Sequence, residues 1–169
     1  MKGGGPMRSL FYHMENTRIK EKNYLYYTPI GITWIFFLIR IILINKNQWQ
    51  TPFYLSELFY FAGALKLAGD LYENLFFVRE LGKRSPRLKK YETAPLSSKS
   101  CYNAYAFIMA KYLLTLTIGS MVLHFIGNLL MKTDWSWHSQ ALEGGIFLMT
   151  GLLLYLLFLA SGIWANAKG

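Results

Sequence analysis

The sequence predicts an all-α integral membrane protein, with four transmembrane helices arranged as two antiparallel hairpins. Of the 169 residues, 53% are hydrophobic, and these residues are concentrated in four long runs. Polar segments separate the runs. A soluble helical domain would instead spread its apolar residues as stripes along amphipathic helices. The length of the chain suits a single domain.

Each apolar run is long enough to cross a membrane, because about 20 helical residues cover about 30 Å of hydrocarbon. We expect the spans at residues 24–44, 53–78, 104–131 and 141–164, within a transmembrane domain of residues 24–164 and before a C-terminal tail of residues 165–169. The connections within the first pair and within the second pair are short. Connections of this length favour antiparallel helical hairpins.

Residues 1–23 form a polar N-terminal segment before the first span. Within it, Met7, Leu10, Phe11 and Met14 recur at helical spacing. This pattern predicts a short amphipathic helix on the membrane surface. A disordered arm, or a segment docked on a partner protein, would be compatible with the same pattern.

The basic residues predict the orientation of the chain. Thirteen of the 18 lie in residues 1–23, 79–103 and 165–169, which four crossings place on the same side. The positive-inside rule puts this side, with both termini, in the cytoplasm or the mitochondrial matrix. If the second run did not cross the membrane, residues 1–23 and 79–103 would lie on opposite sides, which would violate the positive-inside rule. We expect no nucleic-acid partner, since the basic residues flank apolar runs rather than cover an exposed face.

The second span carries four charged residues, which is unusual, since each costs roughly 2.5–3.5 kcal/mol to insert at the centre of a membrane helix. They are Glu57, Lys66, Asp70 and Glu73. On a helical wheel the last three lie within a stripe roughly 60° wide. Lys111 of the third span lies at a depth similar to that of Asp70. We therefore predict an intramembrane polar network of Lys66, Asp70, Glu73 and Lys111.

Glu57 and His124 are further candidates for this network, because both lie in the outer part of their spans. Depth matching, the pairing of residues that lie at similar depths in the membrane, suggests a hydrogen bond between them. Haem bound by two imidazoles would need a second intramembrane histidine, and His13 and His138 lie outside the spans. We therefore expect no cofactor and no metal, unless a partner subunit supplies a second haem ligand to His124.

Three interpretations of the charged stripe remain open. It could be a buried ion-pair network that fixes the register of the helices. It could face charged groups of a neighbouring subunit. It could also line an ion or proton pathway. The chain lacks the paired glycine or proline interruptions that mark many transporters.

The segment RELGKRSPRLKK, residues 79–90, is strongly basic and follows the second span. Its basic residues are Arg79, Lys83, Arg84, Arg87, Lys89 and Lys90. Besides setting the topology, such a segment suits anionic head groups, for example those of cardiolipin. We expect these residues to contact anionic lipid.

The sequence contains no recognisable catalytic motif. The P-loop, HExxH, Gly-x-Ser-x-Gly and paired CxxC patterns are all absent. We therefore expect a non-catalytic structural or accessory subunit of a multisubunit membrane complex, such as a respiratory-chain or ATP-synthase assembly of the mitochondrial inner membrane. The alternative is a small ion, proton or solute transporter or channel subunit that uses the charged second span.

Overall fold

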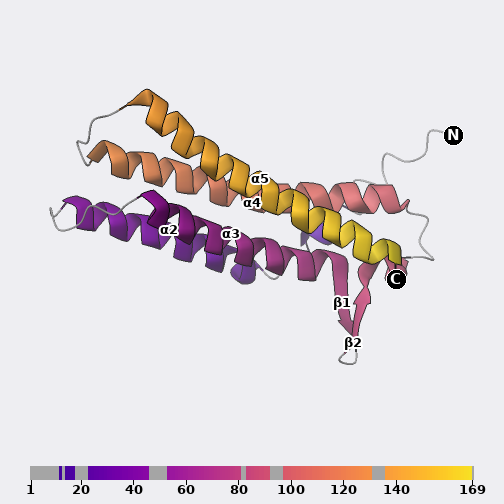
Figure 1. The fold of residues 1–169 in the computed structure, drawn as a ribbon. Coiled ribbons are helices and arrows are strands. Elements are labelled where there is room, and N and C mark those ends of the chain that lie inside the picture. The colour runs from indigo at the N-terminus through magenta and orange to yellow at the C-terminus, as the bar shows by residue number, and fades with distance from the viewer. Residues whose placement is uncertain are drawn as a thin grey trace.

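The computed structural model of the chain describes residues 12, 14–17, 23–45, 53–80, 83–91, 97–130 and 136–168, and almost all of them are helical. The long helices are α2 (Asn23–Asn45), α3 (Phe53–Phe76), α4 (Ser98–Leu130) and α5 (Trp137–Lys168). The remaining elements are β1 (Phe77–Glu80), β2 (Lys83–Pro86) and a 3₁₀ helix (Arg87–Tyr91). Figure 1 shows the four long helices side by side, with the two strands projecting from one end.

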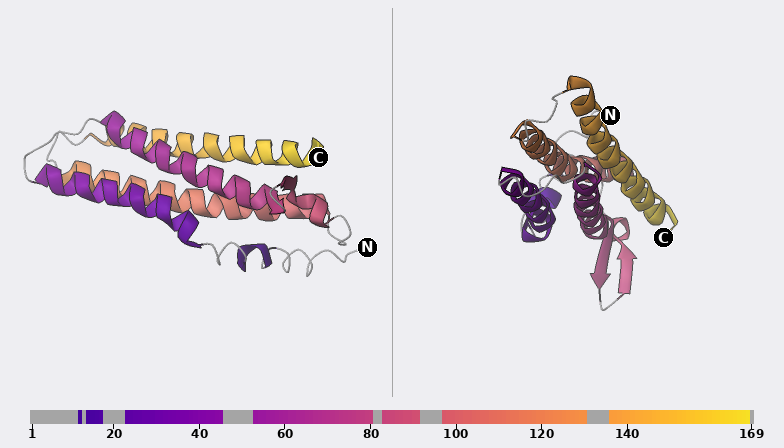
Figure 2. Two further views of the ribbon diagram at one scale, coloured as in Figure 1. Left: turned by 90° about the horizontal axis from the view of Figure 1, so that it is seen from below. Right: turned by 60° about the vertical axis from the view of Figure 1, so that its left-hand side comes forward.

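The four helices form a bundle in which α2 packs on α3 and α4, and α5 packs on the same two helices. Helix α3 also contacts α4. In Figures 1 and 2, the end of α2 and the start of α3 lie at the same end of the bundle as the end of α4 and the start of α5. We call this the junction end. The strands and the C-terminus lie at the opposite end, which we call the hairpin end.

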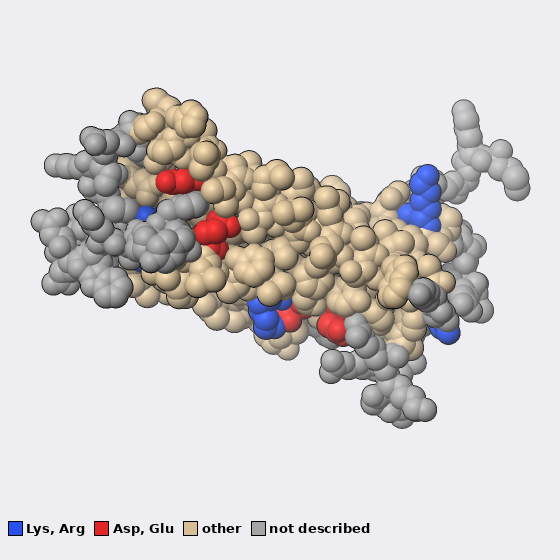
Figure 3. All heavy atoms as spheres, viewed as in Figure 1, with Lys and Arg blue, Asp and Glu red and all other residues tan. Residues whose placement is uncertain are grey.

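Three of these helices are apolar and long enough to cross a membrane, over Tyr24–Ile42, Ser98–Leu130 and Trp137–Ala167. Helix α3 is about as long as α2 but is not among these three, and it carries four charged residues. Many large apolar side chains are exposed on the flanks of the bundle, among them Ile35 and Leu153. Most of the flank seen in Figure 3 is accordingly uncharged. These are features of an integral membrane protein.

Helix α4 begins at Ser98, before the apolar run that the sequence marks from residue 104. Ser97 caps this helix: its carbonyl accepts from the amide of Ser100 at 2.8 Å, and its hydroxyl lies 3.4 Å from the same amide. Serine is a favoured residue at this position, because its side chain satisfies an amide without a partner within the helix. The helix therefore extends beyond its apolar part.

Helix α3 ends at Phe76, two residues before the predicted end of the second span at residue 78, and the chain continues directly into an antiparallel hairpin. Three hydrogen bonds support the base of this hairpin, and the two made by Asn166 tie it to α5. The Arg87 guanidinium donates to the Phe77 carbonyl at 3.0 Å. Asn166 of α5 donates to the Phe76 carbonyl at 3.3 Å and accepts from the Leu88 amide at 3.3 Å. A two-stranded hairpin is marginal by itself, so these contacts matter for its stability.

Part of the predicted N-terminal amphipathic segment is helical, at Tyr12 and residues 14–17. Glu15 is buried, whereas Met14 is half-exposed. The Tyr12 ring meets the Phe107 ring of α4 edge to face, with the centroids 5.4 Å apart. The other members of the predicted stripe, Met7, Leu10 and Phe11, lie outside the described residues.

Helices α2 and α3 approach closely at Gly63. A Cβ atom at this position would overlap the Thr33 hydroxyl, which donates to the Pro29 carbonyl at 2.7 Å. Gly69, on the same helix, has nothing within 4 Å of where its Cβ would be. The two glycines therefore have different roles: Gly63 permits helix packing inside the bundle, and Gly69 lies on an open face of α3.

We predict that Gly63→Ala and Gly69→Ala have opposite effects on the isolated chain. At Gly63 the added methyl group should lower the stability by about 1–3 kcal/mol through overpacking. At Gly69 alanine should be neutral or stabilising by up to about 1 kcal/mol, because it is the better helix former. Thermal unfolding in detergent measures both. Equal effects of the two substitutions would contradict the described α2–α3 contact.

Candidate functional site

Five polar side chains from three helices meet near the junction end of the bundle. They are Arg40 of α2, His124 and Asn128 of α4, and Gln140 and Glu143 of α5. We call this set the buried polar network. Only 3% of Arg40, 0% of His124 and 8% of Asn128 is exposed. The Glu143 side chain keeps 20% exposure.

The network is held by direct hydrogen bonds between side chains. Arg40 contacts His124 Nδ1 at 2.9 Å through Nη1, and donates to Asn128 Oδ1 at 3.1 Å through Nη2. Asn128 Nδ2 donates to Glu143 Oε2 at 2.9 Å and to Gln140 Oε1 at 3.0 Å. His124 Nε2 lies 2.8 Å from the same Glu143 oxygen. These bonds connect α2 to α5 through two residues of α4.

The hydrogen bonds define the protonation state of His124. A guanidinium has donors only, so Nδ1 of His124 must accept from Arg40. The ring proton is therefore on Nε2, from which it is donated to Glu143. The 3.0 Å approach of Asn128 Nδ2 to the same Nε2 then brings two donors together and is not a hydrogen bond. His124 is neutral in this arrangement.

The network balances one positive and one negative charge inside the bundle. Arg40 and Glu143 do not need to touch, because neutral His124 and Asn128 connect them. Buried charges are tolerated when each has partners, and removal of one partner is costly. Both ring nitrogens of His124 are engaged, so iron binding there would have to displace Arg40 or Glu143. Within the described ranges, no three His, Cys, Asp or Glu side chains are grouped so that they could hold a metal ion.

A second group of polar contacts lies deeper in the bundle. Thr117 donates to the Leu113 carbonyl at 2.8 Å, so its oxygen accepts from the Tyr60 hydroxyl, 2.7 Å away. Glu57 accepts from the Thr150 hydroxyl at 2.9 Å. These two bonds connect α3 to α4 and to α5.

The predicted stripe of α3 lies on an outward face of the bundle. Lys66 and Asp70 form an ion pair, with Nζ 2.6 Å from Oδ2. The Lys66 side chain is 65% exposed and that of Asp70 is 24% exposed. Glu73 is half-buried. Lys111 is exposed, with its ammonium 5.7 Å from the centroid of the Tyr112 ring.

The remaining predicted contacts differ from those observed. Between the described side chains of Lys111 and of Asp70 or Glu73, the structure forms no ion pair. His124, which depth matching placed opposite Glu57, contacts Glu143 and Arg40 instead.

Sequence reasoning missed Arg40, Asn128, Gln140 and Glu143 as members of one site. Arg40 and Glu143 lie near the ends of their apolar runs, where charged residues usually reach the membrane surface. A usable signal was present in α4. Its buried polar residues recur every three or four positions, which places them on one helical face. They are Thr117, Ser120, His124 and Asn128.

The basic residues predicted to contact lipid lie at the hairpin end. Arg79 is in β1, Lys83 and Arg84 are in β2, and the register pairs Arg79 with Arg84. Arg87, Lys89 and Lys90 are in the 3₁₀ helix. Of those whose side chains are described, Arg87 is buried and donates to the Phe77 carbonyl, whereas Lys89 is exposed.

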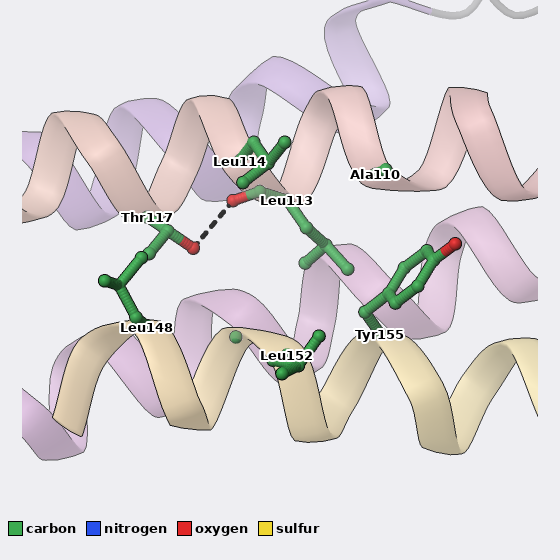
Figure 4. Close-up of a pocket in the computed structure, with 8 residues that line it drawn as sticks. Ala110, Leu113, Leu114, Thr117, Leu148, Leu152 and Tyr155 are labelled. Atoms are coloured by element: carbon green, nitrogen blue, oxygen red, sulfur yellow. Dashed lines mark hydrogen bonds between the residues drawn. The ribbon is translucent and has the colours of Figure 1, made fainter. Parts of the chain in front are cut away.

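A cavity of about 340 Å³ lies between α4 and α5, midway along the bundle. Figure 4 shows its lining, with the Thr117 hydroxyl turned toward the Leu113 carbonyl. The lining residues are Ala110, Leu113, Leu114, Thr117, Leu148, Gly151, Leu152 and Tyr155. None of these carries a charge, so the cavity suits hydrocarbon rather than a charged ligand.

We predict that Arg40→Met strongly destabilises the chain. The substitution leaves Glu143 as a partly buried carboxylate without its cation, at a cost of about 3 kcal/mol. Adding Glu143→Met should recover part of this loss, because no buried charge then remains. Unfolding by denaturing detergent provides the measurement, and Lys99→Met, at an exposed position, is the control. An Arg40→Met variant as stable as that control would show that the network is not formed.

We also predict that His124 is neutral and protonated on Nε2 at neutral pH. Nitrogen NMR of the histidine-labelled chain in lipid nanodiscs distinguishes the two ring nitrogens, and the His124→Gln variant identifies the signals. The expected result is one protonated nitrogen and one unprotonated nitrogen. A doubly protonated ring would contradict the contact between Arg40 and Nδ1.

No protein-family model, no curated protein and no solved structure matches this chain. The functional assignment therefore depends on the residues and contacts described above. The two most distinctive features are the buried polar network and the outward-facing ion pair of α3.

Proposed function

We propose that this chain is a non-catalytic structural subunit of a larger membrane-protein complex, and that the outward face of α3 contacts a neighbouring subunit. The observation that carries this proposal is the exposure of the Lys66–Asp70 ion pair midway along α3. Three neighbouring helices have the length and composition of membrane spans. An ion pair facing hydrocarbon at this depth would be unfavourable, and a polar surface of another subunit would remove that cost.

We further propose that α3 is itself a membrane span, which gives four crossings as two antiparallel hairpins. Its contacts with α2, α4 and α5 support this arrangement, because they place it inside the bundle. Its buried face is apolar and continuous with the core, for example at Ala64, Leu67 and Leu71. The distribution of basic residues supports both termini on the cytoplasmic or matrix side.

The partner that best fits this face is a transmembrane helix with polar side chains. Ala62 is exposed, and space is open beside Gly69. Small residues allow two helices to approach closely, and the ion pair between them offers hydrogen-bonding groups. Since Lys66 and Asp70 neutralise each other, the partner side chains need to be polar but not charged.

The proposed setting is a mitochondrial inner-membrane assembly, such as a respiratory-chain or ATP-synthase complex. The basic residues at the hairpin end support contact with anionic lipid there, for example with cardiolipin. Exposed Lys89 is one of them, and the strand positions Arg79, Lys83 and Arg84 are others. Arg87 would support the hairpin rather than bind lipid, since it is buried against Phe77.

The alternative function, transport along the charged stripe, is less well supported. A pathway through this chain alone would need Lys66 and Asp70 to lie between its helices. Both residues lie instead on the outside of the bundle. Transport by way of this stripe would therefore also require a second subunit to close the path.

Site-specific photocrosslinking in the native membrane tests the subunit proposal. A photoreactive amino acid at Ala62 should crosslink to one defined membrane protein. The same amino acid at Ala160, an exposed alanine of α5, is the matched control and should not crosslink to that protein. The combined substitution Lys66→Met and Asp70→Leu should abolish the Ala62 crosslink while leaving the isolated chain folded. Crosslinks from Ala62 to lipid alone would refute the proposal.

A further inference from the structure

We propose that the bundle contains a site for internal water between Ser56 of α3 and Ser120 of α4. Both side chains are completely buried, each with 0% exposure. Neither hydroxyl oxygen has a hydrogen-bond partner among the described residues. Buried polar groups in folded proteins are almost always satisfied, by protein or by ordered water. Water is the ligand class that two buried hydroxyl groups without protein partners recognise.

The positions of the two serines follow from the bond between Tyr60 and Thr117. The junction end holds the start of α3 and the end of α4, so these helices run in opposite directions. Ser56 lies four residues before Tyr60, and Ser120 lies three residues after Thr117. The two serines therefore lie one helical turn closer to the junction end than the Tyr60–Thr117 bond. They lie on about the same faces of α3 and α4 as that pair, and at the same level as each other.

The small size of the serine side chains favours a gap between α3 and α4 at this level. In the Tyr60–Thr117 pair, the long phenol reaches across the helix interface and makes a direct bond at 2.7 Å. A serine at the equivalent position one turn away is shorter by the whole ring. Two serines cannot make the same connection, and one bridging water would satisfy both hydroxyl groups.

Two neighbouring groups favour hydration of this gap. Glu57 follows Ser56 directly, and its Oε2 atom is buried without a described partner, although Oε1 accepts from Thr150. His124 lies one turn beyond Ser120 on the same face of α4. Water at the serines would thus extend the buried polar network inward to Thr117. The result is a row of polar groups along one face of α4, here called the polar column, which packs beside the buried rings of Phe37 and Phe147.

The column has one open end and one closed end. At the junction end, Glu143 retains 20% exposure and provides the entrance. On the hairpin side of Thr117, the buried face of α4 continues with Leu113 and Met109, and α3 contributes Leu67 and Leu71. These side chains offer no polar atoms to water. The column therefore admits water from the junction side, and on this face of α3 and α4 it ends at Thr117.

Water-edited solid-state NMR on the full chain in phosphatidylcholine bilayers tests this site directly. The Ser56 and Ser120 signals, assigned from the Ser56→Ala and Ser120→Ala variants, should receive magnetisation from water rapidly. Leu116, which is buried on α4 and apolar, is the dry reference. Transfer to both serines as slow as transfer to Leu116 would overturn the proposal.

A double-substitution cycle provides a second measurement that does not depend on the NMR assignment. If one water bridges both hydroxyl groups, Ser56→Ala and Ser120→Ala should each lower the melting temperature, by roughly 2–4 °C. The double variant should lose no more than one of them, because the same water is lost. Ser161→Ala on α5 corrects for the better helix propensity of alanine. Raised melting temperatures, or fully additive losses, would show that the serines do not share a water.

Discussion

The need to compensate the buried guanidinium of Arg40 constrains the junction half of the bundle. A buried cation has to keep both a counter-charge and acceptors for its hydrogen bonds. His124 Nδ1 and Asn128 Oδ1 provide the acceptors, and Glu143 provides the charge from a third helix. Because each bond has a narrow geometric range, the register of α2, α4 and α5 relative to one another is specified by these contacts.

The two halves of the bundle are stabilised by different means. Near the junction end, polar side chains connect the helices, and α3 joins them through Tyr60–Thr117 and Glu57–Thr150. Toward the hairpin end the core is largely apolar and aromatic, and the main polar link described there is made by Asn166. Apolar packing tolerates small shifts of register, whereas a charged network does not. The junction half, which holds the polar side chains, therefore does more than the apolar half to fix the register of the helices.

The sequence predicted the helical content and the approximate positions of the apolar runs, because length and hydropathy are local properties. It also placed Lys66, Asp70 and Glu73 on one stripe. A helical wheel cannot show whether a stripe faces the bundle or its surroundings, and here Lys66 faces outward. Depth matching had the same limit: it gives the level of a residue but not its direction around the helix. His124 was therefore paired with Glu57 rather than with Arg40 and Glu143.

Helix α3 carries polar residues on two opposite faces, which explains its mixed polar and apolar composition. Ser56 and Tyr60 face the interior and are buried, whereas Lys66 and Asp70 face outward. The helix therefore carries polar residues for two separate reasons, and hydropathy alone underestimates how well it fits the bundle. Its inward groups can be satisfied by protein and water within this chain. Among the described residues, α2, α4 and α5 pack on α3, and they leave the Lys66 side chain 65% exposed and that of Asp70 24% exposed. In the proposed arrangement, the cost of placing α3 in a membrane is met in two stages, first by packing within the chain and then by association with a neighbouring subunit.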